Sequence, residues 1–215
     1  FVDGTLITFL RTLLDNPEAL VWEKFWLERN KDLDRELYGL VKWCKPTLPF
    51  GLNVWNRNHF NLLRRAQWPW AEPITYQHQA GEVWTKELGF FRKTVLRDFT
   101  PDEATAGLFR ILGLDEAPFA QLVAAGMDPD TYVFGQCAEA VRGVEGRAQV
   151  YMGIGVDAPR TRPETARCST DIVKRSVLAT YRAGGHGVVL APNYASMHLT
   201  HLDGVAQALD DLGLR

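Results

Sequence analysis

Acidic side chains occur at the carboxyl ends of the expected strands, or just beyond them, at only three points: Asp3, Glu82 and Asp157. A pair of carboxyl groups in different surroundings, one ionised and one protonated, can act as base or nucleophile and as general acid. In α/β barrels the catalytic groups lie at the carboxyl ends of the parallel strands. These three acids are therefore the candidate catalytic residues.

Each of the three acids also has a structural interpretation. Asp3 is followed by Gly4 and can cap the next turn. Glu82 can be a first-turn acid of a helix that begins near residue 83. Asp157 can form an ion pair with an arginine of the following segment, Arg160 or Arg162. The sequence leaves both interpretations open for all three.

Aromatic and hydrogen-bonding side chains gather at or just beyond the same strand ends, and Trp70 belongs to a loop expected near the same edge. Aromatic rings stack on the apolar C–H face of a sugar, and Asn, Gln, His and Arg can hydrogen-bond its hydroxyl groups. Any one of these residues can instead be an ordinary packed or partly exposed side chain. The group as a whole is therefore stronger support for sugar binding than any single residue in it. The candidate substrate-binding residues are Trp55, Asn56, Arg57, His59, Trp70, Tyr76, Gln77, His78 and Tyr194.

Other chemistries have less support in the sequence. His198 and His201 are three residues apart on an expected helix, but no H-E-x-x-H motif or carboxylate at ligand spacing accompanies them, so we expect no metal. Cys137, in the middle of an expected helix, is a weak candidate for a nucleophile. No glycine-rich phosphate-binding motif is present, and we expect no cofactor.

Five strands are expected to position these residues, at 1–2, 50–56, 73–77, 148–156 and 187–191. The helices are expected at 5–14, from Pro17, at 33–43, at 170–183 and at 196–212, with Trp22, Trp26 and Trp43 in the core. A helical insertion is expected at 83–142, with a capping box at Thr100 and Glu103 and a further helix that starts at Asp128-Pro129. Gly184-Gly185 are expected to end the 170–183 helix. Alternation of strands and helices predicts a parallel sheet. The five strands fit either an open doubly wound sheet or the last five strands of an eight-stranded barrel.

Composition narrows the classes of partner. The 215 residues carry a formal net charge of −2, and no basic run suggests nucleic acid or an anionic membrane surface as partner. No apolar stretch reaches the roughly 18 residues of a membrane span. Three widely separated cysteines indicate ordinary thiols. Because the chain opens inside an apparent strand, we expect a missing N-terminal part of the same chain as a partner, and the compartment is unknown.

Three segments resemble strands of (β/α)8-barrel glycoside hydrolases. Phe1-Val2-Asp3-Gly4 is similar to their fourth strand, residues 150–157 to their seventh, and residues 184–190, followed by Asn193-Tyr194, to their eighth. The resemblance implies an α/β fold in which residues 1–215 form a single domain. That domain would be a partial (β/α)8 TIM barrel of about strands 4–8, with the 83–142 insertion inside it.

The same resemblance implies the activity. The chain would hydrolyse a glycosidic bond in a carbohydrate substrate with a carboxylate pair drawn from Asp3, Glu82 and Asp157, and Asp3 would be the first choice for nucleophile or base. Two alternatives remain open. One is a carbohydrate-binding barrel without catalysis, and the other is a metal-dependent TIM-barrel hydrolase that acts on a non-sugar substrate.

Overall fold

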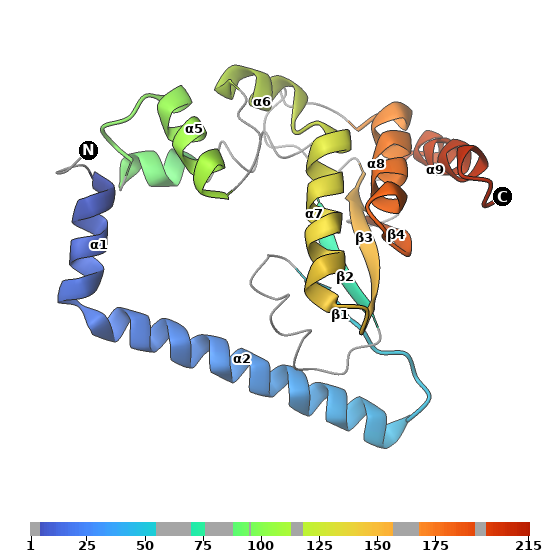
Figure 1. Cartoon of the computed structure of the whole chain (residues 1–215), viewed down its shortest axis with the longest axis horizontal. Coiled ribbons are helices and arrows are strands. Elements are labelled where there is room, and N and C mark those ends of the chain that lie inside the picture. Colours follow the sequence, from blue (N-terminus) through green and yellow to red (C-terminus); the bar gives the residue numbers. More distant parts are fainter. Residues whose placement is uncertain are drawn as a thin grey trace.

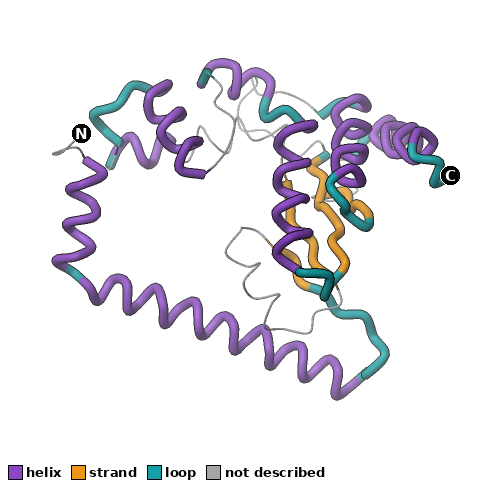
Figure 2. Tube along the Cα trace, in the orientation of Figure 1, coloured by secondary structure: helices purple, strands orange, loops and turns teal. Residues whose placement is uncertain are grey.

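The computed structural model describes residues 5–54, 70–75, 88–94, 96–112, 118–156, 168–191 and 197–215. Helices occupy several times as many of these residues as strands do. A parallel sheet with helices packed on it forms one part of the molecule, and a long helical arm forms another (Figure 1). Figure 2 shows the strands together under the helices that cover them, with the arm running apart from this layer.

The sheet consists of β1 (Leu52–Val54), β2 (Trp70–Thr75), β3 (Gln149–Gly155) and β4 (Gly187–Ala191), in the order β1-β2-β3-β4. All three pairings are parallel, which confirms the parallel sheet predicted from the sequence. β4 spans the predicted residues, whereas β2 begins three residues before the predicted start. β3 is the only one of the four with seven residues, and it hydrogen-bonds to a neighbour on each side.

The main core lies between β3 and two helices, α7 (Pro129–Val144) and α8 (Thr170–Arg182). Val150, Met152 and Ile154 are fully buried, and their even spacing places them on one face of β3. They pack against a row of small and medium side chains, mainly from α7, that consists of Val133, Cys137, Ala140, Val144 and Ala179. Burial thus explains the apolar side chains at alternate positions of β3.

The turn between α8 and β4 follows the predicted glycine signal. Gly184 has a φ of +87°, in the left-handed region that favours glycine, and its amide donates to the carbonyl of Tyr181 at 3.0 Å. The amide of Gly185 donates to the carbonyl of Thr180, also at 3.0 Å. These bonds end α8 and turn the chain directly into β4.

Helix α9 (Leu199–Asp211) packs closely on α8 through Gly204. A Cβ atom at this position would clash with the carbonyl oxygen of Thr170 and would lie 3.2 Å from the amide nitrogen of Lys174. At the other end of α9, Lys174 forms an ion pair with Asp211 at 2.8 Å. The missing side chain of Gly204 therefore sets the distance between the two helices.

Two shorter helices, α5 (Pro101–Leu112) and α6 (Phe119–Ala125), precede α7. The capping box predicted at the start of α5 is confirmed. The amide of Thr100 donates to Glu103 Oε2 at 2.9 Å, and the amide of Glu103 donates to Thr100 Oγ1 at 3.3 Å. Phe109, Leu122 and Met127 form a small separate core under these helices.

The arm consists of α1 (Thr5–Asp15) and α2 (Pro17–Cys44). Two helices were expected after Pro17, but α2 is one helix of 28 residues, because the polar segment in its middle contains no glycine or proline. Ion pairs from Asp32 to Arg29 and Arg35 support this segment. Trp22, Trp26 and Trp43, expected in the core, are 65%, 48% and 82% exposed, so that prediction was wrong.

The prediction of a partial (β/α)8 TIM barrel is also wrong. The described strands form a short open sheet within a mostly helical chain, with β1 and β4 as its two edges. A barrel needs each connecting helix to pack along the sheet. No residue of α2 is buried, and this helix packs against the described main core through partly buried Tyr38. The first predicted strand, residues 1–2, lies outside the described residues.

The close packing of α9 on α8 predicts a difference between two helical glycines. Gly204→Ala should lower the free energy of unfolding by about 1–3 kcal/mol, because the new methyl group overlaps the backbone of α8. Gly135→Ala in α7 is the matched control, since a Cβ added there would meet no neighbouring atom within 4 Å; it should stabilise the protein by up to about 1 kcal/mol. Urea unfolding measures both, and equal effects would contradict the packing described.

Candidate functional site

The carboxyl-terminal edge of the sheet is the place where the sequence predicted the chemistry. β2, β3 and β4 are parallel neighbours, so the chain leaves all three at the same edge. One hydrogen bond extends the ladder past the end of β3, from the amide of Val156 to the carbonyl of Ala191 at 2.7 Å. Val156 is fully buried, so the backbone stays fixed up to the residue that precedes Asp157.

The amino ends of α8 and α9 lie side by side at this edge. Ser169 caps α8 by accepting a hydrogen bond from the amide of Ile172 at 3.2 Å. Thr170 Oγ1 donates to the carbonyl of Thr200, in the first turn of α9, at 3.0 Å. Helix amino ends carry partial positive charge. Two of them held together favour an ionised carboxylate or another anionic group at this edge of the sheet.

His198 and His201 cap α9. Nδ1 of His201 accepts a hydrogen bond from the amide of His198 at 3.1 Å, and the side chain of His198 caps the amide of His201 in return. The two rings meet edge to face with centroids 5.4 Å apart, and His201 is buried. The described residues contain no group of three possible metal-binding side chains. In this structure the two histidines are helix-capping residues.

Two of the thiols are buried. Cys137 Sγ lies 3.5 Å from the carbonyl oxygen of Thr180, and burial raises the pKa of this thiol to about 11. Cys168 Sγ lies 3.6 Å from the carbonyl oxygen of Gly155, near the carboxyl end of β3. A thiol is a nucleophile only as thiolate. The raised pKa therefore makes Cys137 a packing residue at neutral pH.

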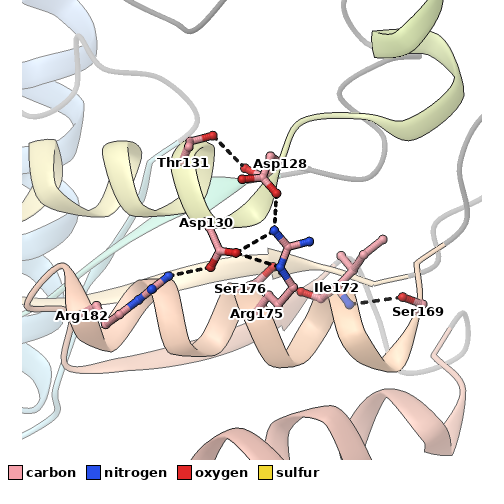
Figure 3. A network of polar contacts seen from close by, with 8 residues as sticks. All are labelled: Asp128, Asp130, Thr131, Ser169, Ile172, Arg175, Ser176 and Arg182. Carbon is pink, nitrogen blue, oxygen red and sulfur yellow. Dashed lines mark hydrogen bonds and ion pairs between the residues drawn. The ribbon is translucent and has the colours of Figure 1, made fainter. Parts of the chain in front are cut away.

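A cluster of ion pairs connects the start of α7 to α8 (Figure 3). Arg175 Nε donates to Asp130 Oδ2 at 2.8 Å, and Arg175 Nη2 donates both to Asp130 Oδ2 at 2.6 Å and to Asp128 Oδ1. Arg182 Nη2 donates to Asp130 Oδ1 at 2.6 Å. Both carboxylates therefore have arginine partners, so this cluster holds the two helices together and offers no unpaired acid for catalysis.

Opposing effects set the pKa of Asp130. Partial burial alone would raise it, but hydrogen bonds and charge attraction from Arg175, and then from Arg182, outweigh burial and lower it. The pKa of the Arg175 guanidinium is raised, chiefly by its hydrogen bond to Asp130. The ion pairs therefore favour the charged form of both partners.

Most of the predicted site residues lie outside the described residues. This holds for all three candidate acids, Asp3, Glu82 and Asp157, and for every predicted substrate-binding residue except Trp70. Trp70 was expected in a loop near the carboxyl-terminal edge. It is instead the first residue of β2, level with Gln149 at the start of β3, so its backbone lies at the opposite, amino-terminal edge.

Two polar features were not predicted from the sequence. Asp128 and Asp130 flank the proline that opens α7, and Arg175 and Arg182 are seven residues apart and so share one face of α8, which was a usable signal. The second feature is His186, just before β4. Its Nδ1 accepts a hydrogen bond from the amide of Val150 at 3.1 Å, and its own amide donates to the carbonyl of Val150 at 2.8 Å. Nothing in the sequence indicated this bond.

The lowered pKa of Asp130 predicts an acid-sensitive contact. A carboxyl group whose pKa is lower in the folded state adds stability above its unfolded pKa, and this stability is lost as the pH falls through the folded value. We expect wild type to lose more unfolding free energy than Asp130→Asn between pH 6 and about 3. The difference should be below about 1 kcal/mol, because the Asp130 side chain is 39% exposed. Urea unfolding at a series of pH values measures both proteins. If the unfolding free energies of wild type and Asp130→Asn change equally with pH, the ion-pair assignment is wrong.

The cysteines should differ in reactivity. Cys44 is exposed, whereas Cys137 is buried and has a raised pKa, so iodoacetamide at pH 8 should alkylate Cys44 much faster. Peptide mass spectrometry of the native protein measures both rates, and urea-unfolded protein is the control in which both should react. Equal rates in the native protein would show that Cys137 is not held as described.

Among the described residues, no helix combines the length and apolar character that a membrane span requires. Comparison of the chain with protein-family models, with curated proteins and with solved structures found no match. The resemblance to glycoside hydrolases therefore stays a prediction.

Proposed function

We propose that the chain hydrolyses glycosidic bonds with a carboxylate pair at the carboxyl-terminal edge of its parallel sheet. The observation that supports this most is the end of β3. This strand pairs with a neighbour on each side, and its backbone stays hydrogen-bonded up to buried Val156. The next residue in the sequence is Asp157, one of the three candidate acids.

The spacing of the strands suits this chemistry. Neighbouring strands lie about 4.8 Å apart, so the ends of adjacent or next-adjacent strands are separated by about 5–10 Å. That range contains the carboxyl separations of both retaining and inverting glycosidases. β2 ends at Thr75, seven residues before Glu82, and lies next to β3. We propose Glu82 as one partner for Asp157 and Asp3 as the other candidate.

Electrostatics at this edge suggests a division of roles. The neighbouring amino ends of α8 and α9 favour the ionised form of a nearby carboxyl group. Asp157 follows β3 and precedes α8 in the chain, so we assign it the role that needs an ionised carboxylate, as nucleophile or base. Glu82 or Asp3 would then act as the general acid, and the aromatic and polar residues after β1, β2 and β4 would hold the sugar.

The proposal is tested by turnover of a panel of 4-nitrophenyl α- and β-glycosides. Asp157→Asn should lower kcat/KM by about 10²–10⁴, the usual contribution of a positioned acid, base or nucleophile. One of Glu82→Gln and Asp3→Asn should cause a loss of similar size. Asp203→Asn is the matched control, because Asp203 is an exposed acid on α9 and is not a candidate; it should keep full activity.

Three results would overturn the proposal. The first is turnover that survives substitution of all three candidate acids. The second is a wild-type chain that binds sugars in calorimetry but hydrolyses none of the glycosides, which would instead indicate carbohydrate binding without catalysis. Activity that disappears on chelation with EDTA would point to a metal-dependent hydrolase and would also contradict the carboxylate mechanism.

A further inference from the structure

Helix α2 presents an apolar stripe to solvent along most of its length. We use the name α2 stripe for five exposed side chains that repeat at helical spacing: Trp22, Trp26, Leu33, Leu37 and Leu40. Their exposed fractions run from 44% to 65%, and no residue of α2 is buried. Large exposed apolar patches usually mark interaction sites.

The described part of the chain leaves the α2 stripe uncovered. The arm meets the main core through Tyr38, which packs against the cluster between β3 and α7, and Tyr38 contacts Phe50 at a centroid distance of 6.4 Å. At 100° per residue, Tyr38 lies on the opposite half of the helix from Trp22, Leu33 and Leu40. The arm is therefore attached by one face and presents the other, and Figure 1 shows α2 running apart from the sheet layer.

Two opposite charges lie along one edge of the α2 stripe, and their spacing indicates what kind of surface would pair with it. Trp22, Arg29, Glu36 and Trp43 are each seven residues apart and so form one row along the edge of the α2 stripe. The row has an aromatic ring at each end and opposite charges in between. In an antiparallel copy of the helix, each charge of the row lies near its opposite. Such a surface complements a second copy of itself, as the interface of a two-fold dimer must.

We propose that α2 is a dimerisation helix that pairs with α2 of a second copy of this chain in antiparallel orientation. A two-fold axis level with residue 31, near the middle of the helix, places Trp22 opposite Leu40 of the second copy. Arg29 then lies opposite Leu33 of the second copy. Glu36 of that copy follows three residues further along, about 4.5 Å at 1.5 Å per residue, within reach of the long guanidinium side chain.

Charge explains why the pair is antiparallel. Parallel pairing would place Arg29 beside Arg29 of the second copy and Glu36 beside Glu36, and like charges across an interface are strongly unfavourable. Arg29 already pairs with Asp32 of its own helix at 2.6 Å, but its side chain is 61% exposed. An exposed pair of this kind is weak and can exchange for an additional contact across the interface.

The test is sedimentation equilibrium of the chain with a charge exchange. The wild type should reach twice its monomer mass of 24.3 kDa. Arg29→Glu and Glu36→Arg should each raise the dissociation constant about tenfold or more, because each change places like charges together twice in the dimer. The double variant R29E/E36R should restore affinity to near wild type, although the contact with Asp32 is lost. This restoration separates pairing between copies from effects within one helix.

Lys31→Glu is the matched control, because it makes the same charge change as Arg29→Glu on the opposite face of α2 and should leave the dissociation constant unchanged. Far-ultraviolet circular dichroism confirms that each variant retains its helices. Three results would overturn the proposal: a wild type that stays monomeric at about 100 µM, where a dimer with a Kd of about 10 µM is mostly assembled; a double variant as weak as the single ones; or association that exceeds two copies and ignores the charge changes.

Discussion

The packing of one face of β3 against α7 and α8 is the constraint on which the rest of the structure depends. β3 is hydrogen-bonded on both sides, and its even-numbered side chains are fully buried. Once this strand is fixed, α7 and α8 take their places over it and β4 pairs along it. α9 is then positioned by its contact with α8, and the arm is attached to this layer through Tyr38. The carboxyl-terminal edge is thus a consequence of core packing.

The sequence predicted the local structure well where a local chemical signal exists. The glycines after α8, the capping box of α5 and the proline at the start of α7 each act over a few residues, so short patterns are enough to find them. The arm was misjudged because apolar periodicity indicates a face that favours burial but does not say whether anything covers it. Trp22 and Trp43 show this, since both are on a correctly predicted type of element and both are exposed.

The barrel was overpredicted for a related reason. Parallel strands with intervening helices have the same local pattern in an open sheet and in a closed one, because closure depends on contacts between distant segments. The candidate site illustrates the same limit. Its electrostatic setting, with two helix amino ends joined through Thr170 and Thr200, comes from residues 30 positions apart. By contrast, a carboxylate immediately after a buried strand, such as Asp157, is a pattern that the sequence alone can supply.

The contact between α8 and α9 also has a mechanical consequence. Gly204 brings the two helix backbones together without an intervening side chain, and the Thr170 hydroxyl joins their first turns. With no deformable layer between them, α8 and α9 have to move as one body. A molecule that draws one helix amino end toward the edge of the sheet would therefore carry the other with it. Local events after β3 would in this way be transmitted to the C-terminal helix.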